Sequence, residues 1–211
     1  MVLTDSEKHS SHSRTLILQS ALQLFSARGY DGTSIDDIRQ AAGFKSKASL
    51  YTHFKTKEEL ASALLHDILV ERDRAVMLAY TMTDPEPLQK LVAVTKAFIT
   101  WGVSHRQKYA FCFLRVQQEI LIQGKAPSYV EEGSQPSDLL LLNLLQELRR
   151  EYPVRPIADS ALSSMMIGMI TRAIIDQAAF GPANQETRVE HILEACFGIL
   201  FSKPVPIPAS I

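Results

Sequence analysis

The sequence predicts an all-α protein, and three observations carry this prediction. Apolar residues recur three and four positions apart through most of the chain, which is the period of an amphipathic helix. From Thr83 onward, no segment shows the alternation of apolar and polar residues that is typical of a half-buried strand. Glycines and prolines stand between the periodic segments, where they would end or begin helices.

Length and composition fit a globular protein of one or two small domains. The chain has 211 residues and a formal net charge of −1, so overall basicity gives no argument for nucleic-acid binding. Cys112 and Cys196 stand far apart in apolar surroundings, which favours reduced, buried thiols over a disulfide framework or a metal site. The polar start does not resemble a signal peptide, and charges interrupt every long apolar run. We therefore expect no membrane span and a cytoplasmic location.

The N-terminal region begins with a polar stretch and continues as a helix. Residues 1–12 are polar and carry charges of both signs, so we predict a disordered N-terminal arm. From Ser13 onward, one helical face collects apolar side chains: Ile17, Leu18, Ala21, Leu22 and Phe25. This helix is predicted to end at Gly29 and to pack behind the segment that follows.

Residues 33–60 are predicted to form two short helices joined by a tight glycine turn, followed by the start of a third helix. Ser34 is a predicted N-cap, with Asp37 placed as its capping-box partner. Gly43 stands where the first helix needs a residue with positive φ to end. Ser46 is a predicted N-cap of the second helix. Together with the preceding helix, this pattern predicts a three-helix domain that contains a helix-turn-helix.

The second of these helices, at about residues 46–53, is the predicted recognition helix. Leu50 and Phe54 lie four positions apart on its inner side. At about 100° per residue, the side chains that point away from Leu50 are Lys45, Ala48, Tyr51, Thr52 and Lys55. The ionised residues between Ile38 and Glu58 are all cations: Arg39, Lys45, Lys47, Lys55 and Lys57. A local basic surface is what contact with DNA phosphates requires, although a solvated, lysine-rich helix would have the same composition.

A set of residues in this segment forms one pattern: Thr33-Ser34, Ile38, Ala42-Gly43-Phe44-Lys45-Ser46, Leu50-Tyr51, His53-Phe54 and Lys57-Glu58-Glu59-Leu60. The pattern resembles the DNA-binding segment of the tetracycline-repressor (TetR) family, and the resemblance covers roughly residues 12–65. Ala48 departs from the family, because many members have glycine there. A methyl group at this position affects how closely the backbone approaches the groove, and so bears on base preference rather than on the fold.

The resemblance, together with the helical geometry, implies two groups of DNA contacts. Five residues are assigned to phosphates: Thr33, Ser34, Tyr51, His53 and Lys57. Five others are assigned to base edges or their immediate surroundings: Lys45, Lys47, Ala48, Ser49 and Thr52. For Tyr51 the alternative is packing in the core between the helices, and for Ser46 a capping role is a sufficient explanation.

The remainder of the chain is predicted to be helical and to form a second domain. The DNA-binding domain is expected over residues 13–60, the effector-binding and dimerisation domain over 61–203, and a tail over 204–211. One helix is predicted to run without a break from Lys57 to about Tyr80 and to link the two domains. The other predicted features follow in order: a helix from Asp84-Pro85 to Trp101, a break near Gly102, a helix that ends by Gly124, a loop over 124–137, and helices over 139–148, 156–180 and 185–202.

Eight residues are candidates for an effector pocket: Trp101, His105, Phe111, Arg115, Met165, Met169, Arg172 and Asp176. For any single aromatic or methionine residue among them, packing in the core is the favoured alternative. The pair Arg172 and Asp176 leaves three possibilities open: an ion pair within one helix, contact with a polar group of a ligand, or contact across a subunit boundary. The sequence shows no catalytic constellation, no phosphate-binding glycine loop and no pair of histidines at zinc spacing. We therefore expect no enzyme activity, no cofactor and no metal.

These observations predict a transcriptional regulator, a repressor that leaves a palindromic DNA operator when an apolar or aromatic small molecule binds. The resemblance implies a homodimer formed through the two C-terminal helices, and their small and apolar residues are compatible with it. Two alternatives stay open. The same DNA-binding dimer is controlled by a protein partner or acts outside transcription, or the chain is a helical enzyme whose basic segment is incidental.

Overall fold

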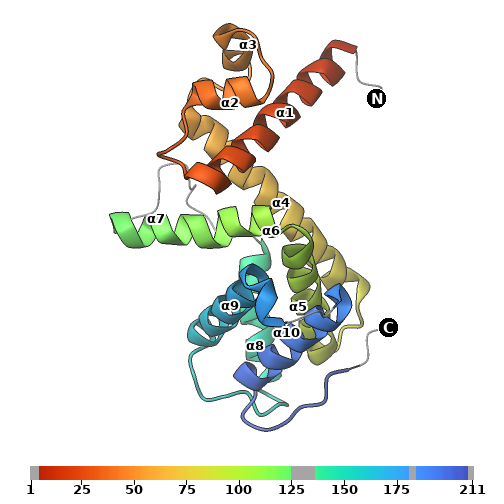
Figure 1. Ribbon diagram of the computed structural model, residues 1–211. Coiled ribbons are helices and arrows are strands. Elements are labelled where there is room, and N and C mark those ends of the chain that lie inside the picture. The colour runs from red at the N-terminus through yellow and green to blue at the C-terminus, as the bar shows by residue number, and fades with distance from the viewer. Residues whose placement is uncertain (1–4, 125–135, 181–183, 209–211) are drawn as a thin grey trace. The chain divides into compact units, whose positions relative to one another are not determined.

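The structure is a computed structural model that describes residues 5–124, 136–180 and 184–208. Its regular elements are helical, which confirms the predicted all-α fold class. In chain order they are α1 (Asp5–Arg28), α2 (Ile35–Ala41), α3 (Lys47–Tyr51), α4 (Lys57–Met82), α5 (Pro87–Ser104), α6 (Arg106–Tyr109), the π-helix η1 (Ala110–Arg115), α7 (Val116–Gln123), α8 (Pro136–Leu148), α9 (Asp159–Ile175), the 3₁₀ helix η2 (Gln177–Phe180) and α10 (Gln185–Leu200) (Figure 1). Within the same residues, no helix has the length and apolarity needed to cross a membrane.

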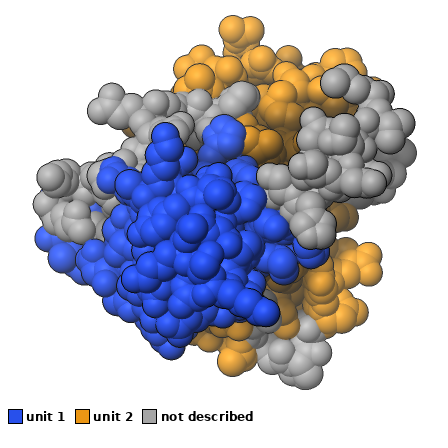
Figure 2. All heavy atoms as spheres, turned by 90° about the horizontal axis from the view of Figure 1, so that it is seen from above, with its two compact units in different colours: residues 1–68, 107–132 blue, residues 69–106, 133–211 orange. Residues whose placement is uncertain are grey.

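The chain divides into two compact units (Figure 2). Unit 1 comprises residues 1–68 and 107–132, and unit 2 comprises residues 69–106 and 133–211. The sequence predicted a single boundary near residue 60. The structure instead assigns the first part of α4, and a second stretch that contains η1 and α7, to the unit that holds the helix-turn-helix.

The core of unit 1 forms where the apolar stripe of α1 meets its neighbours. Ile17, Ala21 and Phe25 recur every four residues along α1 and are fully buried, as the helical period predicts. The ring of Phe25 stacks on that of Phe111 from η1, with 5.9 Å between ring centroids. Phe111 therefore explains why residues 107–132 belong to this unit. This long-range contact has no signal in the local sequence pattern.

Helix α1 begins at Asp5, so the prediction of a disordered arm over residues 1–12 is wrong for residues 5–12. The polar composition of this stretch indicated that nothing there would be buried. It did not indicate how the backbone would fold. No glycine or proline separates Asp5 from Ser13, so the helix that starts in the arm continues into the apolar stripe without a break.

Unit 2 is a layer of helices packed around α5. Helix α5 contacts α8, α9 and α10, while α9 also contacts α8 and α10. The side chain of Glu86 caps α5 by accepting hydrogen bonds from the backbone amides of Leu88 and Gln89, at 3.0 and 2.7 Å. Tyr152 supports this cap, because its hydroxyl donates to the Glu86 carboxylate at 3.0 Å.

Several predicted helix boundaries in unit 2 differ from the structure. Helix α5 begins two residues after Pro85 and continues through Gly102 to Ser104, because Gly102 is buried inside the helix. The burial of its flanking residues outweighs the roughly 1 kcal/mol that a glycine costs in a helix. Helix α9 ends at Ile175 instead of residue 180, since the backbone of Asp176 leaves the helical region at φ −95° and ψ 66°. The predicted loop over residues 124–137 falls largely outside the described residues.

Candidate nucleic-acid interface

The first helix of the predicted helix-turn-helix begins at a complete capping box. The Ser34 hydroxyl oxygen accepts a hydrogen bond from the Asp37 amide at 3.1 Å, and the Asp37 carboxylate accepts from the Ser34 amide at 2.8 Å. The hydrogen bond from the Ser34 hydroxyl, at 2.6 Å, also lowers the pKa of Asp37. The predicted N-cap is therefore confirmed, and the entry into α2 is fixed by two residues that are local in sequence.

The turn between α2 and α3 is a Schellman motif centred on Gly43. Gly43 has φ +78°, its amide donates to the Gln40 carbonyl at 3.0 Å, and the Phe44 amide donates to the Arg39 carbonyl at 3.1 Å. The positive φ predicted for Gly43 is confirmed. The side chain of Arg39 also stabilises this turn, because its guanidinium donates to both the Asp36 carboxylate and the Phe44 carbonyl.

Helix α3 spans Lys47–Tyr51, with Ser46 as its N-cap and Thr52 as its C-cap, close to the predicted recognition helix at about 46–53. The Ser46 hydroxyl oxygen accepts from the Ser49 amide at 3.2 Å, which confirms the predicted cap. Leu50 is only 1% exposed, whereas the side chains that surround it on the helix are exposed. The helix therefore has one buried side that holds it in place, and a broad outer surface that is open to a partner.

Six of the ten predicted DNA contacts lie on this outer surface and are exposed: Lys45, Lys47, Ala48, Ser49, Tyr51 and Thr52. Tyr51 is 45% exposed, which excludes the alternative that it fills the core between the helices. Lys55, which was not among the ten, is also exposed and extends the surface toward α4. Two features of the sequence could have placed Lys55 among the predicted DNA contacts: it lies in the cation-rich stretch, and it points away from Leu50.

The other four predicted contacts have partners inside unit 1. Thr33 is 1% exposed and its hydroxyl donates to the Gly29 carbonyl at 2.8 Å, so this side chain is engaged within unit 1, and its assignment to a phosphate stays a prediction. The Ser34 hydroxyl is engaged in the capping box. The His53 ring is half-buried and packs edge-on against Phe44, with centroids 6.3 Å apart.

Lys57, the fourth of these residues, holds the loop that follows α1. Its ammonium group donates to the Tyr30 carbonyl at 3.0 Å and lies 4.1 Å from the centroid of the Tyr30 ring. Both contacts satisfy the charge internally, one as a hydrogen bond and the other as a cation–π interaction. In this structure Lys57 therefore tethers the first residue of α4 to the loop that follows α1.

The cations of the acid-free stretch are not equally available. Arg39 donates to Asp36 at 2.8 Å, and this hydrogen bond lowers the pKa of the Asp36 carboxyl. The Lys47 ammonium lies 3.9 Å from the same carboxylate, but its side chain remains 69% exposed. The stretch contains no acid, yet Asp36 from the preceding turn of α2 compensates part of its charge. Lys45, Lys47 and Lys55 remain as the exposed cations of the stretch.

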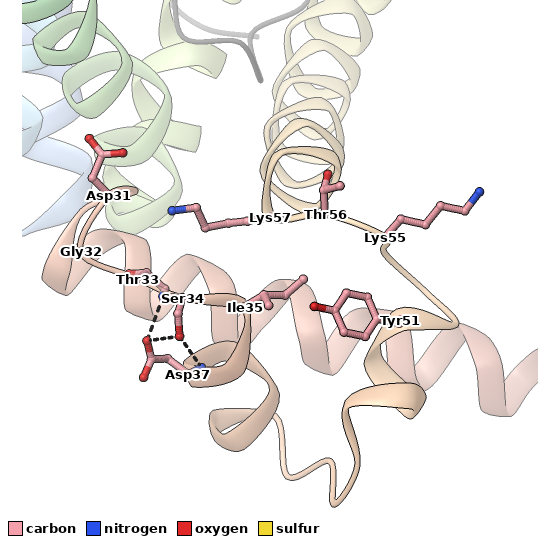
Figure 3. Close-up of a pocket in the computed structure, with 10 residues that line it drawn as sticks. All are labelled: Asp31, Gly32, Thr33, Ser34, Ile35, Asp37, Tyr51, Lys55, Thr56 and Lys57. Atoms are coloured by element: carbon pink, nitrogen blue, oxygen red, sulfur yellow. Dashed lines mark hydrogen bonds between the residues drawn. The ribbon is translucent and has the colours of Figure 1, made fainter.

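A pocket of about 450 Å³ lies beside these residues, between the loop before α2, the end of α3 and the start of α4 (Figure 3). In Figure 3, Lys57 extends toward the loop that holds Asp31, Lys55 points the opposite way, and the Tyr51 hydroxyl is directed toward Ile35. Hydroxyl, amide and ammonium groups at such a rim suit a phosphate oxygen of a nucleic-acid backbone.

Of the candidates for an effector pocket whose side chains the structure describes, one belongs to unit 1 and the others to unit 2. Phe111 belongs to the core of unit 1, whereas Trp101 and His105 lie in unit 2. The Trp101 and His105 rings stack with centroids 5.8 Å apart, and the Trp101 indole nitrogen donates to the Glu71 carboxylate at 3.2 Å. The His105 Nε2 atom lies 3.5 Å from the same carboxylate oxygen.

The remaining candidates belong to α9 and η1. Arg172 is 78% exposed and pairs with Asp176 at 2.6 Å, so the intrahelical ion pair is the arrangement that the structure has. Met165 is exposed and Met169 is half-buried. The side chain of Arg115 lies outside what the structure describes. Among the described residues, the structure shows no group of histidine, cysteine or acidic side chains that could hold a metal ion.

Comparison with known proteins decides the family. Residues 17–64 match the family described as "Bacterial regulatory proteins, tetR family". The HTH-type transcriptional repressor KstR2 of Mycolicibacterium smegmatis is 29% identical to the chain over 158 residues, which are 74% of each protein. Residues 17–64 are a TetR-family DNA-binding segment. The resemblance seen in the sequence is thereby confirmed, and its residues are those of α1 to α4.

Other TetR-family proteins differ in how much of the chain they match. The regulator IcaR of Staphylococcus epidermidis, a negative transcriptional regulator of a biofilm operon, is 52% identical over 44 residues. Those residues are 21% of this chain and 23% of IcaR. The solved structure of the ketosteroid transcriptional regulator KstR2 of Mycobacterium tuberculosis superimposes with a TM-score of 0.71 at 21% identity, covering 90% of this chain and 95% of that one. The TetR-family fold therefore extends through the second half, where the sequence has diverged.

Proposed function

We propose that this chain is a transcriptional regulator that binds operator DNA as a homodimer through α2 and α3, and that represses transcription. The relatives named above are transcriptional regulators, two of them described as a repressor and a negative regulator. The observation that carries the proposal is the outer surface of α3. A short helix held by two caps and a buried leucine presents exposed lysines and small polar side chains beside a pocket of about 450 Å³.

A binding experiment tests this proposal. The measurement is the affinity of the purified protein for the genomic region that flanks its own gene, against an unrelated duplex of equal length, at several salt concentrations. Specific regulators bind their sites at least about 10³-fold more tightly than other DNA. Lys45→Gln should weaken binding, whereas Lys203→Gln, an exposed lysine of the C-terminal tail, serves as the matched control and should not. Equal affinities for both duplexes would refute the proposal and favour the alternative of a helical enzyme whose basic segment is incidental.

The proposed dimer uses the exposed sides of α9 and α10. These sides carry small or flexible residues: Ser164, Met165, Gly168, Ala195 and Gly198. A Cβ atom added at Gly168 or Gly198 would meet nothing within 4 Å in the chain itself, so both glycines leave room for a partner backbone. Two-fold pairing would present two recognition helices about one turn of DNA apart, or a multiple of it, to a palindromic site.

Two substitutions at one position test the dimer. Gly198→Glu places a charge on the proposed contact surface and should give monomers with greatly weakened operator binding. Gly198→Ala is its matched control, since a methyl group fits the open space and leaves the surface uncharged. Sedimentation of the unmodified protein as a monomer at micromolar concentration would contradict the proposal.

Release from DNA is proposed to depend on a small molecule that binds unit 2. Helix α4 runs without interruption from Lys57 to Met82 and contributes residues to both units. Trp101 and His105, whose rings stack in unit 2, are the residues proposed to contact an apolar or aromatic ligand. The structural relative described as a ketosteroid regulator supports this class of ligand.

The ligand must prefer the conformation that does not fit the operator, and its effect is limited by that preference. A change from almost fully bound to almost fully released requires a preference of about 5.5 kcal/mol. Calorimetric titration of apolar candidates with and without operator DNA measures this coupling directly. Operator DNA must weaken ligand binding by the same factor by which the ligand weakens operator binding. Equal ligand affinities in the two titrations would favour control by a protein partner.

A further inference from the structure

The outer surface of α3 offers methyl groups, rather than hydroxyl donors, at its centre. At about 100° per residue, Ala48 and Thr52 each lie about 160° from the buried Leu50, so they stand four residues apart at the outermost line of the helix. Both are exposed. Any base edge that faces the middle of this helix therefore meets these two side chains first.

The serine and threonine hydroxyl groups of this surface are already hydrogen-bonded within the helix and its N-cap. The Thr52 hydroxyl donates to the Ser49 carbonyl at 2.8 Å. The Ser49 hydroxyl is paired with the Ser46 hydroxyl at 2.8 Å, and the Ser46 oxygen also accepts the Ser49 amide. Because the Thr52 hydroxyl turns back onto the backbone, the side chain has its Cγ methyl group and the lone pairs of its oxygen left to offer. Ala48 has only its methyl group.

We propose that Ala48 and Thr52 read the C5 methyl groups of thymines in the major groove of the operator. Thymine is the base that presents a methyl group in this groove, and alanine and threonine methyl groups are its usual apolar partners. Four residues of helix rise about 6 Å, which corresponds to about two base-pair steps of 3.4 Å. The two thymines should therefore lie within about two steps of each other in each half-site. This inference rests on the proposed function, because it concerns the same α3 surface.

The experiment begins by selecting bound duplexes from a randomised DNA library with the full-length protein. Deoxyuridine then replaces each thymidine of the selected site in turn, which removes the methyl group and keeps the base pair. For the unmodified protein, replacement at a contacted thymine should weaken binding about fourfold per half-site, the effect of burying one methyl-sized group. In the Ala48→Gly variant, binding should no longer change when deoxyuridine replaces the thymine that Ala48 contacts. In the Thr52→Ser variant, the same should hold for the thymine that Thr52 contacts.

The comparison of thymidine with deoxyuridine within each variant cancels any change in helix stability that the substitution causes. Lys203→Gln, an exposed lysine of the C-terminal tail, is the control and should leave the fourfold preference for thymine intact. If no sequence is selected at all, the proposed function fails together with this inference. If a site is selected but deoxyuridine binds as well as thymidine at every position, or the preference survives in both variants, the thymine assignment alone is overturned.

Discussion

The turn at Gly43 gives a sharp test of how α3 is held. Gly43 has φ +78°, and a Cβ atom added there would meet nothing within 4 Å. The cost of a side chain is therefore conformational rather than steric contact with neighbours. The left-handed region costs an L-residue about 1–2 kcal/mol, so Gly43→Ala should lower the free energy of unfolding by about that amount, and Gly43→Val by more because it is β-branched. Gly43→Asn should cost much less, since asparagine tolerates this region.

The assay is urea unfolding and thermal melting of the three variants beside the parent protein, together with operator affinity. A loss of about 1–2 kcal/mol corresponds to a drop of roughly 2–8 °C in Tm for a chain of this size. DNA affinity should fall in the order Asn, Ala, Val, because relief of the strain changes the angle at which α3 leaves the Schellman turn. Equal stabilities for the alanine and asparagine variants would show that positive φ is not what the turn requires.

Three further predictions concern charge and titration. With Lys45, Lys47 and Lys55 exposed in each of two protomers, the logarithm of DNA affinity should fall with the logarithm of salt concentration with a slope of about −5, measured by anisotropy. Burial raises the pKa of Cys196 to about 12, so the native protein should leave this thiol unreacted with a chromogenic thiol reagent near neutral pH, and denaturant should release it. The hydrogen bond to the α5 cap raises the pKa of Tyr152, so its contribution to stability is present below about pH 10 and lost above it. The stability difference between parent and Tyr152→Phe should shrink in that range.

The local features of the interface could be predicted because their causes lie within a few residues. The Ser34 box, the positive φ of Gly43 and the Ser46 cap each depend on side chains or backbone atoms at most five positions away. The inward position of Leu50 follows from the helical period alone. Such short-range rules gave the existence and order of α1 to α4 and the register of the recognition helix.

The sequence did not predict which side chains would have their partners inside the folded chain. Thr33 looked like a surface residue, but its hydroxyl is buried against Gly29. Lys57 looked like a phosphate ligand, and its ammonium instead meets Tyr30, 27 positions away in sequence. Phe111 was a candidate for the effector pocket and packs against Phe25. For Lys57 and Phe111 the partner comes from a different helix or loop, and no pattern in a single segment reveals it. For Thr33 the partner lies four positions earlier in the same loop, and the local pattern did not show that the hydroxyl would be buried.

Internal partners of the cations also change the electrostatic argument for DNA binding, because a count along the sequence does not show them. A count along the sequence gives five cations between Ile38 and Glu58, and a dimer in which all ten were free would show a salt slope of about −9. In space, Asp36 engages Arg39, and the Tyr30 ring and carbonyl engage Lys57, so the expected slope is much shallower. Because fewer phosphates are neutralised, less of the affinity is shared with non-specific DNA. A larger part of the affinity must then come from contacts that distinguish bases, and these contacts are made by the outer surface of α3.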